Sequence, residues 1–473
     1  MNSKFKYLSK NILLFSISTF ATKILAFLMV PLYTRVLTTQ EYGTIDLLQS
    51  TVQLLLPIIT FNIAESVMRF SFDEDNLEKT FTKGSILTIK GTLVLSLITL
   101  MFHFIFPKIF LLEYIFILTL LVFLNGIYNL YVNFLRAIDK VQNIVIASII
   151  YSAVMMGVNV IVLVIFHLGI IGYFFSMIIG YFIAIIYLEV STSAFRLFFK
   201  PSVQDKKLGK AMTNYSIPTV LTNISWWINS SSDRYIVTWL LGVSENGIYS
   251  ISNKIPSIFS MVHGVFSQAW NISAIKEFGA KDRDKFYQTT YSYYSFVTVF
   301  IAMVIILFNK LICFILFSQE FYSAWRYAPL LVVAAVFSAF NGFTGGIFGA
   351  IKRTKILAFS TGLSALSNII CNFIFIPSMG AVGAALATAI SYIFSWILRI
   401  IILQRNNCKL QLNWLKENIT YVLLFIQAVL ASLENSYYVI QIFIIVLSII
   451  FHKTIIASIF TKIVKYKNQK MGY

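Results

Sequence analysis

Four basic side chains of this sequence lie in or beside long apolar segments, where a charge needs a partner. Lys23 and Lys254 fall inside apolar runs, and neither has a carboxylate one turn away on its own predicted helix. Such a charge requires water, an acidic partner on another helix or an anionic ligand. Arg35 lies near the end of a run and can act as an interface anchor, and Arg234 can form a local charge pair with its neighbour Asp233. Lys23 and Lys254 therefore favour a cationic cavity.

Uncharged polar residues repeat at helical spacing on several of the same segments. In the segment 247–271, polar or small residues recur every third or fourth position from Asn253 onward. The candidates for the cavity lining are Gln49, Gln53, Asn223, Trp226, Asn253, Ser257 and Gln268, and the candidates for ion coupling are Asp46, Glu65 and Asp233. Two simpler interpretations stay open. Isolated hydroxyls and amides can hold neighbouring helices together, and Glu65 can pair with Arg69 four residues on.

The elements that must position these residues are transmembrane helices. Hydrophobic residues make up 58% of the 473 and charged residues 12%, whereas soluble domains have about 45–50% and about 25%. Apolar runs of about 20 residues match the hydrocarbon thickness of a bilayer. The sequence predicts an all-α polytopic membrane protein with about fourteen spans: 11–34, 45–68, 85–107, 112–135, 143–166, 169–190, 212–241, 247–271, 290–317, 327–350, 355–377, 381–403, 418–433 and 437–460.

The net charge of +18 is explained by orientation in the membrane. Most of the 37 Lys and Arg fall on one side if the N-terminus is cytoplasmic, and the positive-inside rule then places the C-terminus there too. Nucleic acid is not a predicted partner. The histidines and cysteines have no metal-binding spacing, and the glycines of 345–349 lack the Gly-Lys-Ser/Thr of a phosphate loop, so neither a metal nor a cofactor is predicted.

An internal repeat divides the chain. Residues 37–43 align with 241–247, residues 168–181 align with 379–392, and Ala137-Ile138 aligns with Ala350-Ile351. Each repeat holds six helices, an even number, so both point the same way across the membrane. We expect an N-terminal six-helix bundle (1–190), a basic cytoplasmic linker (191–210), a C-terminal six-helix bundle (211–403), and two appended helices with a basic tail (404–473).

Two motifs resemble a known family. Residues 31–46, Pro-Leu-Tyr-Thr-Arg-Val-Leu-Thr-Thr-Gln-Glu-Tyr-Gly-Thr-Ile-Asp, are similar to the first-loop signature of polysaccharide exporters in the MOP superfamily. Residues 379–390, Met-Gly-Ala-Val-Gly-Ala-Ala-Leu-Ala-Thr-Ala-Ile, resemble the twelfth-helix signature of that family. The O-antigen and capsule repeat-unit flippases of the Wzx type are the most similar members. The MATE exporters and the lipid II flippase are more distant.

The resemblance implies two six-helix bundles of the MATE-like type and a function in the cytoplasmic (inner) membrane. The implied substrate is an oligosaccharide linked to undecaprenyl pyrophosphate, moved by alternating access, with a polysaccharide polymerase and a chain-length regulator as further candidate partners. A diphosphate pairs well with ammonium and guanidinium groups, so Lys23, Arg35, Lys254 and Arg234 are candidates to hold it. The polar lining, Trp226 included, suits hydroxyl-rich sugars.

Three alternatives remain. A drug or metabolite antiporter of the same fold would need an acidic cavity for cationic drugs, whereas the predicted cavity has at least as many cations as acids. A membrane enzyme of glycan synthesis would need a large outer loop with carboxylates, and no outer loop exceeds about 20 residues by the predicted spans. The protein is therefore not expected to be an enzyme. A scaffold that does not transport is the third alternative.

Overall fold

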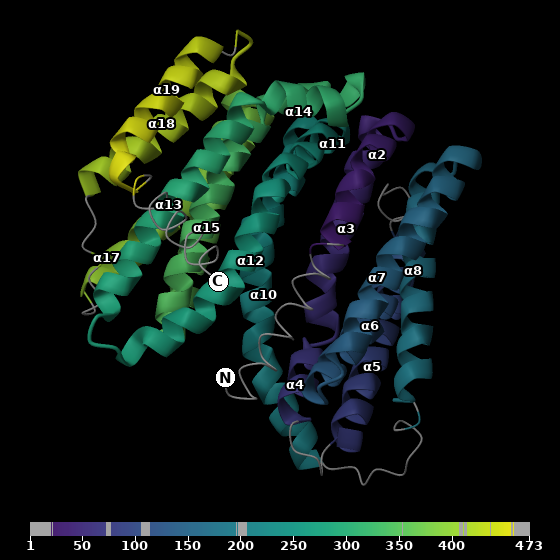
Figure 1. The fold of residues 1–473 in the computed structure, drawn as a ribbon. Coiled ribbons are helices and arrows are strands. Elements are labelled where there is room, and N and C mark those ends of the chain that lie inside the picture. Colours follow the sequence, from purple (N-terminus) through teal and green to yellow (C-terminus); the bar gives the residue numbers. More distant parts are fainter. Residues whose placement is uncertain are drawn as a thin grey trace, which may run out of the picture. The chain divides into compact units, whose positions relative to one another are not determined.

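A computed structural model describes residues 22–71, 77–105, 114–194, 206–351, 353–405, 414–435 and 437–455, together with positions 20, 196, 410 and 457. The part of the chain that it describes is helical throughout, with short turns (Figure 1). The packing divides the chain into two compact units, residues 1–232 (unit 1) and 233–473 (unit 2). The division falls inside a single long helix, α10 (Lys206–Leu241).

Unit 1 contains seven helical segments before α10. They are α2 (Val30–Val36), α3 (Thr39–Ile59), α4 (Ile63–Phe70), α5 (Leu77–Ile105), α6 (Ile115–Ala137), α7 (Val141–Asn159) with a π-helical end (Val160–Ile165), and α8 (Gly169–Thr192). Residues 22–28 are also helical. The start of the first predicted span, residues 11–19, lies outside the described residues. So does half of the predicted basic linker, residues 195 and 197–205.

Unit 2 begins in the second part of α10. It continues with α11 (Val243–Ser252), α12 (Lys254–Lys276), α13 (Arg283–Leu307), α14 (Asn309–Leu316), a 3-10 helix (Gln319–Arg326), α15 (Ala328–Ala350), α16 (Thr354–Met379), α17 (Ala381–Arg405), α18 (Trp414–Ser432) and α19 (Tyr438–Phe451). The predicted basic tail after residue 457 lies outside the described residues.

The two units repeat one pattern of helix neighbours, as a repeat would. In unit 1, α6 packs against α4, α5 and α8, and α8 packs against α7; in unit 2, α15 packs against α12, α13 and α17, and α17 packs against α16. Helices α6 and α15 are both 23 residues long, and a shift of 213 positions superimposes their ends. Gly169 is the first residue of α8 and Gly380 precedes α17, with φ of 51° and 61°, a conformation that favours glycine.

Large apolar side chains are exposed along whole helices, which is expected for a surface in contact with lipid. On α8, Phe175, Phe182 and Ile186 are 49%, 57% and 45% exposed, whereas Phe174 and Leu188 of the same helix are fully buried. A helix that is apolar on every side is buried in protein or in a membrane. The chain is a multi-pass membrane protein.

Nine of the described helices are long and apolar enough to cross a membrane, and the bent pair α3–α4 adds a tenth if it forms one span. Helices α10 and α12 are 36 and 23 residues long but are not among the nine. The sequence predicts polar faces on both helices, and the polar residues of those faces lower the hydropathy of the helices.

The last two helices form part of unit 2. Helix α18 packs against α13, α15 and α19, and α18 and α19 are the yellow pair in Figure 1. The buried carboxylate of Glu417 on α18 accepts hydrogen bonds from Ser295 Oγ of α13 at 2.8 Å and from Tyr421 at 3.0 Å. Gln427 Nε2 donates to the carbonyl of Met303 at 2.9 Å. Bonds to buried polar groups fix the register of α18 on α13.

Candidate functional site

A break in the second span of unit 1 produces the geometry of the candidate site. Helices α3 and α4 meet at an angle of 53°, and Phe61 and Asn62 between them have left-handed backbone, with φ of 50° and 49°. Helix α5 runs close against this break, because a Cβ on Gly91 would lie 2.0 Å from the carbonyl oxygen of Ile59. The sequence predicted one continuous span over 45–68; the left-handed pair interrupts it and redirects Glu65 and the rest of α4.

A polar cavity of about 550 Å³ lies beside this break, within unit 1. Its size falls in the range of small-molecule sites, about 300–1,000 Å³. Its walls come from α3, α4, α5, α6 and α10, and no residue of α7 or α8 contributes to the described lining. The lining consists of Gln53, Leu56, Pro57, Thr60, Asn62, Ile63, Ala64, Glu65, Met68, Thr88, Gly126, Asn129, Asn133, Arg136, Tyr215, Asn223, Trp226, Trp227 and Ser230. We call it the unit 1 cavity.

Helix α6 carries a row of asparagines, which we call the asparagine ladder: Asn125, Asn129 and Asn133. Asn129 and Asn133 line the unit 1 cavity. Asn129 Nδ2 donates to Asn125 O at 3.1 Å and to Asn125 Oδ1 at 2.7 Å. Asn133 Nδ2 donates to Asn129 O at 2.9 Å. The amide N–H groups thus point back along the helix, and the Oδ1 atoms of Asn129 and Asn133 remain as hydrogen-bond acceptors.

Another part of the lining comes from α10, which hydrogen bonds connect to α3, to α4 and to Asn62 between them. Ser66 Oγ donates to Met212 O at 2.7 Å, and Asn62 Nδ2 donates to Thr219 Oγ1 at 2.8 Å. Trp227 Nε1 donates to the carbonyl of Ser50 at 2.7 Å. These bonds fix one indole, while the neighbouring indole of Trp226 is 49% exposed. The wall is therefore rigid and presents an aromatic surface.

Four of the predicted site residues line the unit 1 cavity: Gln53, Glu65, Asn223 and Trp226. Glu65 and Arg69, both described, form no ion pair with each other in this structure. Gln49 instead donates to the Tyr173 hydroxyl of α8 at 2.8 Å, so it joins two helices of unit 1. Asp46 is half-buried on α3, and Lys23 and Arg35 are exposed.

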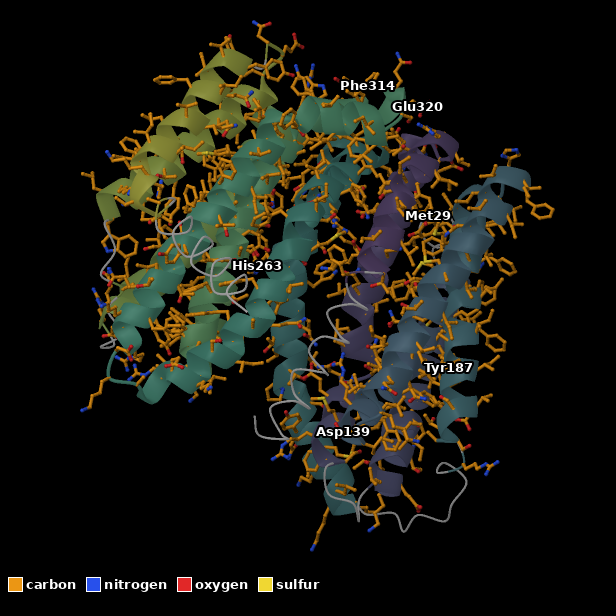
Figure 2. The ribbon with its side chains drawn as sticks, viewed as in Figure 1. Met29, Asp139, Tyr187, His263, Phe314 and Glu320 are labelled. Atoms are coloured by element: carbon orange, nitrogen blue, oxygen red, sulfur yellow. The ribbon has the colours of Figure 1, made fainter. Side chains whose placement is uncertain are left out.

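The remaining predicted residues belong to unit 2. Lys254, Arg234 and Gln268 are half-buried. Asn253 Nδ2 donates to Tyr249 O at 3.1 Å, and Ser257 Oγ donates to Lys254 O at 2.6 Å. Both bonds lie at the break between α11 and α12, where Lys254 begins the second helix. Figure 2 marks α12 with His263, whose ring hydrogen-bonds the hydroxyl of Tyr294.

Asp233 belongs to a second, buried polar cluster in unit 2. Its carboxylate is 5% exposed and accepts hydrogen bonds from Tyr249 at 2.5 Å and from Thr388 Oγ1 at 3.3 Å. Asn368 Nδ2 donates to Thr388 Oγ1 at 3.3 Å, and Asn372 Nδ2 donates to Asn368 Oδ1 at 3.0 Å. The cluster joins α10, α11, α16 and α17. A buried carboxylate is costly unless it is hydrogen-bonded, so these donors explain how it is tolerated.

Sequence reasoning missed the asparagine ladder and the partners of Asp233. The signal for the ladder was present, because Asn125, Asn129, Asn133 and Arg136 recur at spacings of four, four and three on one helix face. The partners of Asp233 lie far along the chain, on α16 and α17, and no local pattern connects them to it. Within the described part of the chain, no three or more His, Cys, Asp or Glu side chains gather as a metal site would require.

The fold and the family follow from comparisons with known proteins. A structure titled lipid II flippase MurJ, inward closed conformation, has a TM-score of 0.70 at 17% identity, over 94% of this chain and 100% of that chain. An inward-facing MATE multidrug transporter of the MOP superfamily has a TM-score of 0.66 at 13% identity, over 81% of this chain and 95% of that one. The repeated helical units are thus those of the MOP-like polytopic fold.

The chain matches the polysaccharide biosynthesis protein family over residues 8–271 and the MatE family over residues 218–374. The first match covers more than half of the chain, so this protein belongs to the polysaccharide biosynthesis protein family. A relative in Haloferax volcanii, named probable low-salt glycan biosynthesis flippase Agl15, is 26% identical over 208 residues. The match spans 42% of this chain and only 42% of the length of that relative.

Proposed function

We propose that this protein is a flippase that moves a lipid-linked oligosaccharide across the cytoplasmic membrane by alternating access, for the synthesis of a surface polysaccharide. The observation that carries the proposal is the unit 1 cavity. Its amide, carboxylate and indole groups lie inside a helical unit whose outer surface is apolar. Polar groups at membrane depth are costly and mark substrate pathways. The family and the name of the archaeal relative support the same function.

Four basic residues are the reason for proposing a substrate with an anionic head group. Lys23 and Arg35 in unit 1, and Arg234 and Lys254 in unit 2, are exposed or half-buried, so a ligand can reach them. We propose that they neutralise the pyrophosphate of an undecaprenyl carrier. Charge-assisted hydrogen bonds from ammonium and guanidinium groups suit phosphate oxygens.

Unit 2 offers an apolar site that suits the lipid part of such a substrate. A cavity of about 730 Å³ lies between α15, α17 and α18 and is lined mainly by aliphatic and aromatic side chains, among them Ile393, Ile397, Trp396 and Phe425. An isoprenoid chain that moved there from the lipid would pass from one apolar environment to another. Its binding would therefore depend on van der Waals packing and not on charge.

Asp233 is the proposed coupling residue, with Asp46 and Glu65 as the other candidate carboxylates. It is a buried acid surrounded by hydroxyl and amide groups. Uptake of a cation or proton there would change the net charge of unit 2. Movement of one charge across the membrane potential supplies about 2.3 kcal/mol per 100 mV.

The cellular setting belongs to the same proposal. The end product would be an O-antigen or a capsule, and a polysaccharide polymerase and a chain-length regulator would receive the substrate after transport. Both termini would face the cytoplasm, since the basic segments of the sequence require that orientation. The protein would be a transporter and not an enzyme.

The test uses the full-length protein in vesicles that contain a fluorescent lipid-linked oligosaccharide. An impermeant reagent that destroys outward-facing label measures how much substrate changes leaflet. We expect protein-dependent exchange of the inner-leaflet pool and at least a tenfold loss in the Lys23→Ala, Lys254→Ala double variant, since each removed cation leaves a phosphate charge unpaired. Equal exchange in vesicles with and without protein would show that the protein is no flippase.

A second candidate is a multidrug or metabolite antiporter, which the MatE match over residues 218–374 favours. Such a protein would bind small cations through Asp233 or Glu65. Vesicles loaded with a cationic dye separate the two functions. Dye efflux driven by an ion gradient, without exchange of the labelled lipid, would replace the flippase proposal with the antiporter.

A further inference from the structure

We propose that the unit 1 cavity is a subsite that recognises one neutral or N-acylated pyranose of the transported oligosaccharide through an array of hydrogen-bond acceptors. The inference rests on the proposed function, which supplies the oligosaccharide, and adds where one of its sugars binds and which sugars are accepted. The carrying observation is that Asn129 and Asn133 of the asparagine ladder, Glu65 and the exposed residue Trp226 all line one cavity.

The asparagine ladder faces the cavity as a set of acceptors. Asn129 Nδ2 donates to both the carbonyl and Oδ1 of Asn125, and Asn133 Nδ2 donates to the carbonyl of Asn129. The Oδ1 oxygens of Asn129 and Asn133 can therefore accept hydrogen bonds from a ligand. An amide oxygen can accept two hydrogen bonds. Two such oxygens one helical turn apart are spaced for neighbouring donors on a single ring.

Glu65 adds a charged acceptor on the adjacent wall. It lies on α4, three residues beyond the left-handed Asn62, and is half-buried. Its carboxylate oxygens accept and cannot donate when ionised. A ligand beside Glu65 and the ladder is therefore favoured when it supplies donors. Hydroxyl groups and the N–H of an acylamino group do so.

The same acceptors disfavour an acidic sugar. A uronate would place its carboxylate near that of Glu65, and like charges at short range oppose binding. Arg136, the basic residue of the described lining, is exposed and lies in the last turn of α6, beyond the ladder. The centre of the wall is thus formed by neutral acceptors, which selects neutral or N-acylated pyranoses.

Trp226 supplies the remaining contact. The indole of Trp227 is fixed through its bond to Ser50, whereas Trp226 is 49% exposed beside the cavity. A rigid aromatic face provides a large amphipathic contact at low entropic cost. The apolar face of a pyranose can pack on this ring while its hydroxyl groups reach the ladder on α6.

Saturation-transfer NMR on the purified full-length protein tests the subsite without transport. The probes are methyl N-acetyl-glucosaminide, methyl glucoside and methyl glucuronide. We expect the first two to bind more tightly than the third. The Asn129→Leu, Asn133→Leu double variant should weaken binding about tenfold, because two buried acceptor bonds are lost. Trp226→Ala is the second variant, since its exposed side chain is not required for packing. Asn143→Leu on α7, which does not line the cavity, is the matched control.

The vesicle assay of the same variants separates failure of the subsite from failure of the proposed function. If the wild type exchanges labelled substrate, the double variant should need about ten times more substrate for half-maximal exchange. Exchange by the wild type with unchanged half-saturation and glycoside binding in both variants would overturn the subsite alone. Tighter binding of the glucuronide would also overturn it. No exchange by the wild type would overturn the flippase proposal and, with it, the assignment of this cavity to a transported sugar.

Discussion

The fourth helices of the two units, α6 and α15, have the same length and pack against equivalent helices, but the residues on their packed faces differ. The shift of 213 positions that superimposes their ends places Asn129, Asn133 and Arg136 on Gly342, Gly346 and Gly349. In unit 1 the asparagines line a cavity of about 550 Å³. In unit 2, Cβ atoms on Gly342 and Gly346 would lie 3.3 Å from His263 Nε2 and 2.7 Å from Trp270 Nε1.

Aromatic side chains of α12 and α13 fill this region of unit 2. Trp270 stacks on Phe343 with ring centroids 3.9 Å apart and donates its Nε1–H to the carbonyl of Phe343 at 2.8 Å. Phe266 stacks on Tyr294 at 4.2 Å. Small residues allow close packing of helices in a membrane. One scaffold thus encloses a polar cavity where the fourth helix carries amides, and a closed aromatic core where it carries glycines.

The buried carboxylate of Asp233 shows the opposite difference between the units, because the polar residue is in unit 2 and its equivalent in unit 1 is apolar. A shift of 204 positions, which superimposes the starts of α3 and α11, places Asp233 and Tyr249 on Met29 and Ile45. Both of these unit 1 residues are buried and apolar. Figure 2 labels Met29, and also Asp139, which follows the last turn of α6. We infer that the two units have different roles: unit 1 contacts the sugar, and unit 2 couples transport to an ion.

The largest expected effect comes from Gly91, which allows the break of unit 1. Gly91→Val should prevent folding, because even a Cβ would lie 2.0 Å from the backbone oxygen of Ile59 and a backbone atom cannot rotate away. We expect loss of the monodisperse peak in detergent chromatography. Gly157→Val is the control, since no atom lies within 4 Å of its Cβ position. A normal yield of folded Gly91→Val would contradict the close packing of α5 on the break.

The next effect tests the coupling residue. Asp233→Asn keeps the size of the side chain and removes the charge that Tyr249 and Thr388 stabilise. Exchange driven by an ion gradient should fall about a hundredfold in vesicles, because the buried cluster of unit 2 then has no carboxylate to take up the cation or proton. Binding of methyl N-acetyl-glucosaminide should not change. Gradient-driven exchange at the wild-type rate would remove Asp233 from the mechanism.

Exchange of residues between the fourth helices should have intermediate effects. Gly346→Asn inserts a side chain against Trp270 and Asn271 and should destabilise the protein by about 1–3 kcal/mol through overpacking. The reciprocal Asn133→Gly should cost about 0.3 kcal/mol through helix propensity, since asparagine is itself a weak helix former. Thermal unfolding in detergent measures both. A smaller loss in Gly346→Asn than in Asn133→Gly would show that the unit 2 interface is not closed.

The smallest effect is at the fixed indole. Trp227→Phe keeps the ring and removes the bond to the Ser50 carbonyl, so it should cost about 1 kcal/mol, the usual net value of a hydrogen bond. Trp226→Phe removes no hydrogen bond between the indole and a described residue and should leave the unfolding temperature unchanged. Equal unfolding temperatures for the two variants would mean that the bond between α10 and α3 contributes nothing to stability.

The sequence predicted the helices, the repeat and part of the site, and the limits have physical causes. Spans and repeat follow from hydropathy and spacing, which are local. Gln53, Asn223 and Trp226 were predicted to line a cavity because polar groups in apolar helices are costly. The sequence did not predict the helix break at Asn62. Neither Phe61 nor Asn62 is a glycine, the residue that most strongly indicates left-handed backbone. The partnership of Asp233 with Thr388 depends on tertiary packing across 155 positions.

Thiol modification tests the difference between the units most directly. Cysteine replaces Asn129 of α6 or Gly342 of α15, equivalent positions in the repeat, on a background in which Cys313, Cys371 and Cys408 are alanine. A water-soluble methanethiosulfonate reagent then measures access. We predict rapid modification of Asn129→Cys, slowed by added lipid-linked oligosaccharide, and no modification of Gly342→Cys. Equal rates at the two positions, or a rate at Asn129→Cys that substrate leaves unchanged, would contradict a substrate cavity confined to the fourth-helix region of unit 1.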